Sequence, residues 1–175
     1  MLQGFFLCRM PTFAFILNKS LMNNILRIKD EEDLVKVLEL QKISFSEVAK
    51  LIGNYDLLPL RQTLSQIQEE FKQGIILKYI NENNSILGSV RGYVDNRNIC
   101  HIGKLIVHPN FQNKGIGKAL MYEIENFFPL CQKFTLFTGK ETPNTFYLYN
   151  KIGYHVVEEI ALDGVSMIIM EKSYK

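Results

Sequence analysis

The chain has 175 residues, of which 47% are hydrophobic and 22% are charged, and its net charge is +2. This length suits one globular domain with a substantial core, and so small a net charge gives no reason to expect nucleic acid as a partner. Cys8, Cys100 and Cys131 are odd in number and widely spaced. They argue against a disulfide framework or a metal site and fit a reducing compartment, so we expect a cytoplasmic protein without a metal.

The first 21 residues contain two short apolar runs, which Arg9 and Pro11 separate. Neither run approaches the ~20 residues that span a bilayer, and no basic region precedes the first. We therefore expect no membrane segment and no signal peptide. Residues 1–21 are interpreted as an N-terminal extension outside the fold that adds little stability, and residues 22–175 as the domain.

The next part of the chain predicts one strand and two helices. A short strand is expected over residues 24–29, and Asp30 is a suitable cap for the helix that follows. The apolar residues of this helix keep helical spacing from Leu34 to Ile52, with a break near Ser44, and Gly53 ends it. A second helix is expected over residues 60–72, closed by Gly74.

The remaining elements predict a sheet with further helices packed on it. Three strands are expected over residues 75–80, 86–94 and 99–107, because polar turns separate them. Later elements are a helix over 116–128, a strand over 133–138, a helix over 144–152, and a hairpin of strands 154–162 and 165–172 around Asp163-Gly164. This order predicts an α+β fold: one domain with a mixed, mostly antiparallel sheet and about four helices.

Residues 99–128 are the most informative stretch, because a buried strand, a His-Pro break, a glycine-bearing turn and a helix follow one another. The first amides of a helix have no partner within it and carry partial positive charge. Gly115 and Gly117 allow close backbone approach, and Lys114 and Lys118 add positive charge. The turn therefore predicts an anion site that suits a pyrophosphate.

Other interpretations of this turn fit less well. A dinucleotide-binding turn needs a third glycine, but Leu120 occupies that position. A P-loop needs Ser or Thr after its lysine, and Ala119 follows Lys118. A plain strand-to-helix turn is the structural alternative.

Gln112-x-x-Gly115-x-Gly117, after a strand that ends in Leu-Ile-Val-His-Pro, resembles the (Gln/Arg)-x-x-Gly-x-(Gly/Ala) motif of the GCN5-related N-acetyltransferases. A second block, Leu-Tyr-Asn-Lys-Ile-Gly-Tyr at residues 148–154, is similar to a run of the same family. The resemblance covers roughly residues 23–172. It implies transfer of an acetyl group from acetyl-coenzyme A, the co-substrate, to a primary amine on a small molecule or peptide.

The resemblance also implies where the co-substrate binds. The backbone of three strand residues would face the thioester and pantetheine: Leu105, Ile106 and Val107. The turn amides would hold the pyrophosphate, through Gln112, Asn113, Lys114, Gly115, Ile116, Gly117 and Lys118. Many members place an asparagine seven residues before the family's tyrosine, where this chain has Thr142. Asn144 is therefore a candidate pantetheine ligand, with capping of the following helix as the alternative.

Two side chains are candidates for the chemistry. Tyr149 falls at the position of the family's tyrosine that faces the sulfur, where a phenol can protonate the leaving thiolate. An amine must lose its proton before it attacks, so a base, a water chain or a desolvating pocket is needed. The family often uses a carboxylate on or beside the central strand, but none lies in residues 99–107. His101 is the candidate base there, and a structural histidine bonded to a carbonyl is the alternative that we favour.

The acceptor itself is not specified by the sequence. Its pocket is expected between the two early helices, their connection over residues 53–59 and the final hairpin. A domain that binds acyl-coenzyme A as a sensor without transferring the acyl group is the alternative function. A homodimer is compatible with the predicted sheet edges.

Overall fold

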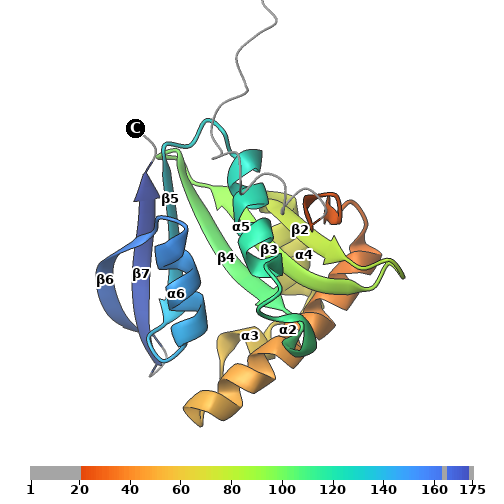
Figure 1. The fold of residues 1–175 in the computed structure, drawn as a ribbon, viewed down its shortest axis with the longest axis horizontal. Helices are drawn as coiled ribbons and strands as arrows, with labels where there is room; N and C mark the ends of the chain where they lie inside the picture. The colour runs from red at the N-terminus through yellow and green to blue at the C-terminus, as the bar shows by residue number, and fades with distance from the viewer. Residues whose placement is uncertain (1–20, 163–164, 174–175) are drawn as a thin grey trace, which may run out of the picture.

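The computed structural model describes residues 21–162 and 165–173, so the extension over 1–20 and the Asp163-Gly164 turn lie outside the described residues. Seven strands form one sheet in the order β1-β2-β3-β4-β5-β7-β6, with helices on both faces (Figure 1). The expected mixed, mostly antiparallel α+β fold is confirmed. The elements are β1 Ile25–Arg27, α2 Glu31–Ile52, α3 Leu58–Arg61, α4 Leu64–Gln73, β2 Ile75–Ile80, β3 Ile86–Val94, β4 Ile99–Val107, η1 Pro109–Phe111, α5 Ile116–Phe127, β5 Lys133–Gly139, α6 Pro143–Lys151, β6 His155–Leu162 and β7 Val165–Ser173.

Helix α2 is continuous, so the predicted break near Ser44 is wrong. Ser44 is buried, and its hydroxyl donates to the carbonyl oxygen of Val107 at 3.3 Å. A mid-helix serine disturbs a helix when it competes for local backbone groups, but this hydroxyl bonds to the sheet instead. The predicted end is correct, because Gly53 adopts φ 68° at the C-cap.

The second predicted helix is two helices, α3 and α4, which meet at Gln62 and Thr63. Thr63 and Gln66 form a capping box, in which each side chain accepts a hydrogen bond from the other residue's backbone amide. This box starts α4 at Leu64 and satisfies two amides that have no intrahelical partner. The Thr-x-x-Gln signature was present in the sequence, and the prediction overlooked it.

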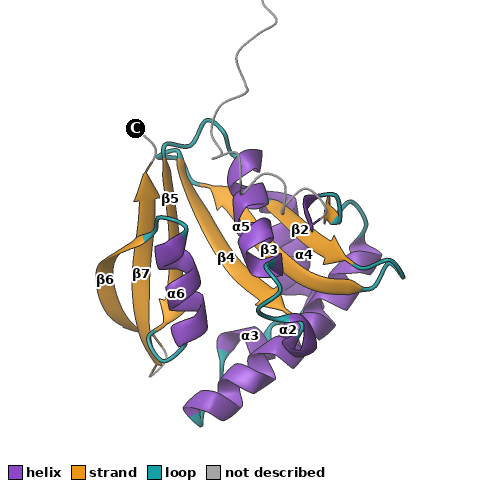
Figure 2. Cartoon of the chain, in the orientation of Figure 1, coloured by secondary structure: helices purple, strands orange, loops and turns teal. Residues whose placement is uncertain are grey.

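The sheet has a buried core on each face, as the helices on its two sides indicate (Figure 2). The larger core joins the sheet to α5 and α6, with Leu120, Ile124 and Phe134 among its members. The smaller core joins the sheet to α2 and α4 through residues such as Leu34 and Ile67. Among the described residues, no helix is both long and apolar enough to cross a membrane.

A β-bulge in β4 changes which face its side chains occupy. Ser89 of β3 pairs with Ile106, whereas Arg91 pairs with Gly103, so β4 holds one extra residue between these pairs. Lys104 lies in the bulge with φ 52°. As a result, Ile102 packs in the core against α5, while Ile106 packs in the core against α2 and α4.

Strands β4 and β5 are neighbours over only the first part of β4. Their parallel pairing runs from Ile99 opposite Lys133 to His101 opposite Thr135. Beyond these pairs the two strands diverge toward α2 and α3 (Figure 1). The second half of β4, from Gly103 to Val107, therefore has no ladder with β5, and the sheet opens at this point.

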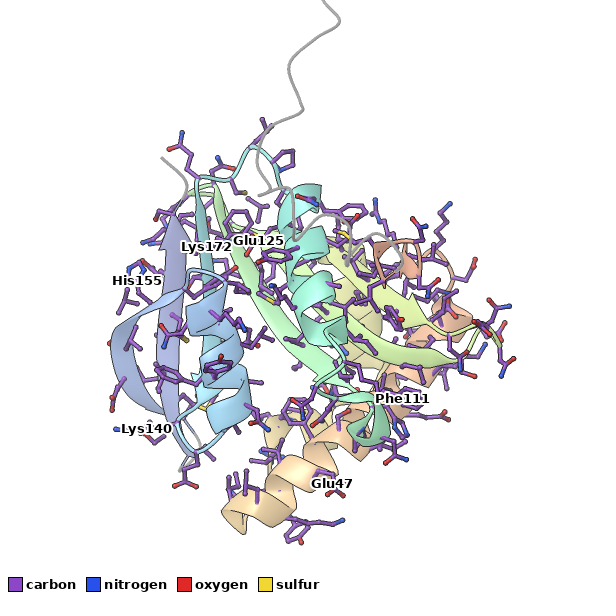
Figure 3. All side chains as sticks on the ribbon, in the orientation of Figure 1. Glu47, Phe111, Glu125, Lys140, His155 and Lys172 are labelled. Atoms are coloured by element: carbon purple, nitrogen blue, oxygen red, sulfur yellow. The ribbon has the colours of Figure 1, made fainter. Side chains whose placement is uncertain are left out.

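At the closed end of the opening, a buried polar cluster joins α5 to the last two strands. The Tyr154 hydroxyl donates to Glu125 Oε1 at 2.9 Å, and Lys172 Nζ lies 2.6 Å from Glu125 Oε2. Figure 3 shows Glu125 and Lys172 approaching each other from α5 and β7. These charge-assisted bonds stabilise the closed end, where β5 still pairs with β4.

We predict that Tyr154→Phe lowers the free energy of unfolding by about 1–3 kcal/mol, because it removes a hydrogen bond to a buried carboxylate. Urea unfolding measures this change. Tyr79→Phe is the matched control, because Tyr79 is also buried in the sheet but its hydroxyl makes no hydrogen bond to another described residue. Equal losses in the two variants would contradict the prediction.

Candidate functional site

A cavity of about 570 Å³ occupies the opening between β4 and β5. Its walls come from α2, α3, the turn before α5, α6 and the β6–β7 hairpin. The first early helix, the connection over 53–59 and the final hairpin were expected around the acceptor, whereas no residue of the second predicted helix, 60–72, lines the cavity. Tyr149 lines it, together with most of the predicted co-substrate residues: Leu105, Ile106, Val107, Gln112, Asn113, Gly115, Ile116, Gly117, Lys118 and Asn144. Lys114 and His101 are predicted site residues that do not line this cavity.

The turn before α5 presents a run of backbone amides at the cavity. From Gly115 to Lys118, no amide donates a hydrogen bond to another described residue, and the first helical bond runs from Ala119 to the carbonyl of Gly115. Gly115 is the N-cap of α5 with φ 83°, and no side chain caps the helix. These amides and the helix dipole give the turn the character of an anion site.

The side chains around the turn support its backbone. Gln112 Nε2 donates to the carbonyl oxygen of Val107 at 3.2 Å, so this side chain links the turn to the end of β4. The Lys114 ammonium lies 4.7 Å from the centre of the Phe111 ring, and Lys118 Nζ lies 5.5 Å from that of Tyr122. Lys114 is thus held beside the turn, outside the cavity, where its charge still adds to the positive potential.

We predict that Gly115→Ala lowers the free energy of unfolding by roughly 1–2 kcal/mol, because an L side chain is strained at its left-handed φ. The added Cβ would also lie 3.3 Å from Leu21 Cδ1. Gly117→Ala is the control, since its Cβ would meet no atom closer than 3.5 Å. Denaturant unfolding of both variants checks this; no difference between them would contradict the role of φ.

Tyr149 of α6 lines the cavity and is only 6% exposed. Its hydroxyl makes no hydrogen bond to another described residue, and its ring centre lies 6.1 Å from that of Tyr154. Burial raises the pKa of the Tyr149 phenol above its ordinary value. The hydroxyl therefore keeps its proton at neutral pH and can donate it inside the cavity.

Three threonine hydroxyls that sequence reasoning missed also line the cavity. Thr138 Oγ1 lies 3.2 Å from Thr142 Oγ1 and 3.0 Å from Thr145 Oγ1. Thr142 is the N-cap residue of α6, which places Asn144 inside the first turn. Asn144 is thus not the helix cap, and its exposed side chain borders the cavity. The replacement of the family's asparagine by Thr142 was the one signal in the sequence for this cluster.

His101 lies away from the cavity, at the end where β4 and β5 are paired. Its Nε2 lies 3.0 Å from Asp95 Oδ2, and its ring stacks on Tyr93 with centres 4.9 Å apart. The hydrogen bond with His101 and the amides of Ile99 and Arg97 hold the pKa of Asp95 below its usual range. This placement does not support the base role predicted for His101. The alternative of a structural histidine fits this placement, with the Asp95 carboxylate rather than a carbonyl as its partner.

Few charged side chains line the cavity. Its carboxylates, among the described residues, are those of Asp56 and Glu141. Asp56 Oδ1 lies 3.2 Å from Arg61 Nε. The pKa of the Lys104 ammonium at the bulge is lowered, because burial outweighs the opposing attraction of the Glu70 carboxylate 4.0 Å away. No group of His, Cys, Asp and Glu suited to a metal ion occurs in the described part of the chain.

A buried polar network fixes the α3 side of the cavity. Arg91 of β3 donates through Nη2 to Gln41 Oε1 at 2.6 Å and through Nη1 to Gln62 Oε1 at 3.0 Å and to Glu70. Gln41 Nε2 in turn donates to the carbonyl oxygen of Pro59 at 2.8 Å. Side chains of α2, α4 and β3 therefore hold the backbone of α3 at the cavity.

Comparison with known proteins identifies the family. The sequence matches the acetyltransferase (GNAT) family over residues 34–154. The chain belongs to the GNAT family. It is 26% identical over 128 residues to an uncharacterized N-acetyltransferase of Porphyra purpurea. This alignment covers 67% of this chain and 72% of that protein.

Solved structures share the GNAT fold. The PaiA N-acetyltransferase of Thermoplasma acidophilum in complex with coenzyme A aligns over 86% of this chain and 99% of its own, with a TM-score of 0.71 and 21% identity. A GNAT family acetyltransferase of Elizabethkingia anophelis with acetyl-CoA bound aligns over 69% of this chain and 90% of its own, with a TM-score of 0.55 and 25% identity. The cavity therefore lies in an acetyltransferase fold.

Proposed function

We propose that this GNAT protein transfers the acetyl group of acetyl-coenzyme A to a primary amine by direct attack. The observation that carries this proposal is the cavity in the opened sheet, which is lined both by the turn before α5 and by Tyr149. The coenzyme A complex of the Thermoplasma acidophilum protein and the acetyl-CoA complex of the Elizabethkingia anophelis protein support it, because both share this fold.

The residues present suit the co-substrate in two ways. The amides from Asn113 to Lys118 suit the pyrophosphate, because a helix N-terminus offers donors and partial positive charge without a counter-ion. The backbone of Leu105, Ile106 and Val107 is assigned to the pantetheine amides, because this part of β4 has no ladder with β5, although the Val107 carbonyl already accepts from Ser44 and Gln112. The Asn144 side chain and the threonine hydroxyls add polar groups on the α6 side.

Tyr149 is the residue that we assign to the chemistry. In the proposed reaction the amine nitrogen bonds to the thioester carbon, the carbon–sulfur bond breaks, and the departing thiolate takes the phenolic proton. The proton lost by the nitrogen then restores the phenol, so that an amide and a thiol result. A buried phenol with a raised pKa suits this role, because it stays protonated until a thiolate forms beside it.

Binding of the co-substrate is tested first, by thermal unfolding with acetyl-coenzyme A, coenzyme A, ATP or NAD added separately. A ligand at about 100 times its Kd stabilises the folded state by ~2.7 kcal/mol. We expect a higher Tm with acetyl-coenzyme A and coenzyme A and no change with NAD. An unchanged Tm at saturating acetyl-coenzyme A would overturn the proposal.

Replacement of the phenol tests the transfer step. Tyr149→Phe is expected to lower kcat about 10²-fold, because it removes the proposed general acid, and to leave the Kd for acetyl-coenzyme A unchanged. Thiol release during amine acetylation measures kcat, and Tyr79→Phe, at a buried position outside the cavity, is the control. A wild-type chain that binds acetyl-coenzyme A but transfers nothing to any amine would instead be a sensor.

A further inference from the structure

The walls of the cavity belong to two different faces of the sheet. On β5, Phe134 and Leu136 are buried in the core with α5 and α6, so Phe137 points to the opposite face. On β7, Ile168 belongs to that core, so the neighbouring side chain of Met167 also points to the opposite face. These two side chains therefore face the side of α2 and α3, away from the turn amides and Tyr149.

We name this second part of the cavity the acceptor chamber. It is defined by the lining side chains of α2, the α2–α3 connection, α3, and the α2-facing side of the last three strands. Its apolar members are Phe45, Val48, Ile52, Leu57, Leu58, Phe137, Leu162, Val165 and Met167. The chamber meets the co-substrate part of the cavity through the gap between β4 and β5, where a thioester carbonyl and an amine can approach each other.

Several of these apolar side chains are exposed to solvent. Phe137 is 57% exposed, Leu58 48% and Leu162 39%, although all three line one cavity. Exposed apolar side chains are ordinary when scattered, but a cluster that lines a concave site marks a place where a ligand covers them. An apolar ligand in the chamber removes this surface from water and gains binding free energy from it.

The charges in the chamber do not suit a polycation. Asp56 is the one carboxylate among its described lining residues, and Arg61 already lies 3.2 Å from it. Lys104 adds a positive charge at the bulge. A polyamine or an aminoglycoside carries several ammonium groups, each of which loses hydration on entry and needs an anionic partner. The described residues that line the chamber offer no such set of partners.

We infer that the acceptor of this chain is a primary amine carried on an apolar body, such as an aryl or alkyl group, which the acceptor chamber covers. This inference rests on the proposed acetyl transfer. The apolar wall also favours the chemistry, because a desolvating pocket disfavours the ammonium form and supplies the neutral amine that must attack. Desolvation of the amine in the chamber would then take the place of the base role that was predicted for His101.

The test compares amines of different bodies in the full chain. Phenethylamine and hexylamine represent apolar bodies, and spermidine and lysine represent charged ones. We expect the coenzyme A complex to bind phenethylamine in calorimetry, and kcat/KM for the apolar amines to exceed that for spermidine at least about tenfold, as hydrophobic pockets discriminate. Failure of phenethylamine to bind the coenzyme A complex, or a higher kcat/KM for spermidine, would overturn the inference.

Substitutions of exposed apolar residues in the acceptor chamber test whether the preference for apolar amines arises there. Phe137→Ser and Leu58→Ser are expected to raise the KM for phenethylamine about tenfold and to leave the Kd for acetyl-coenzyme A unchanged. The matched controls are Val157→Ser on β6 and Leu51→Ser on α2, which are exposed apolar residues outside the cavity. Equal KM values in wall and control variants would place the acceptor elsewhere.

The same measurements separate failure of this inference from failure of the proposed function. If acetyl-coenzyme A does not bind, the proposed function fails, and the inference fails with it. If acetyl-coenzyme A binds and spermidine or lysine is acetylated while the apolar amines are not, acetyl transfer stands and only the inference is overturned.

Discussion

The parallel pairing between β4 and β5 stops after His101, and the rest of the site depends on this limit. A continuous ladder would use the backbone groups of Leu105 to Val107 within the sheet and would leave no space between the strands. Because the ladder stops, this edge of β4 borders a cavity whose lining residues belong to both sheet faces. The cluster around Glu125 supports the paired end, so the opening is confined to the end that faces α2 and α3.

The bulge at Lys104 complements this opening. One extra residue in β4 reverses the alternation of side chains, so that Ile106 turns to the α2 face while Leu105 and Val107 turn to the α5 face. Without it, the end of β4 would present the opposite set of side chains on each face. The end of β4 therefore packs against both cores, with Leu105 and Val107 toward α5 and Ile106 beneath α2.

The sequence was sufficient for features whose cause is local. The order of strand, turn and helix before α5 was predicted correctly, because its glycines and the start of the helix lie within a few residues of one another. Features with distant causes escaped prediction. The Ser44 hydroxyl finds its partner at Val107, 63 residues away, so the residue looked like a helix break.

The position of His101 along its strand also did not show whether its side chain reaches the cavity. The sequence placed it on β4 but gave no sign of where the ladder with β5 ends, and that limit decides which residues of β4 reach the cavity. Gly103 was the one sequence signal for the bulge, because a glycine inside a strand often marks one, but nothing indicated that Lys104 adopts a positive φ. Phe137 could have been used as a sequence signal. It is an apolar residue between two inward-facing positions of β5, which indicates an apolar surface on the other face of that strand.

The polar network around Arg91 holds the α3 wall through the Pro59 carbonyl, a backbone group that every residue type supplies. Different residues therefore determine the position of this wall and its chemistry. Buried side chains of α2, α4 and β3 fix the position of the α3 backbone, and the exposed Leu58 side chain is available for contact in the cavity. In the proposed reaction, single replacements at the chamber surface would therefore change which amine is accepted, while the buried network would keep the wall in place.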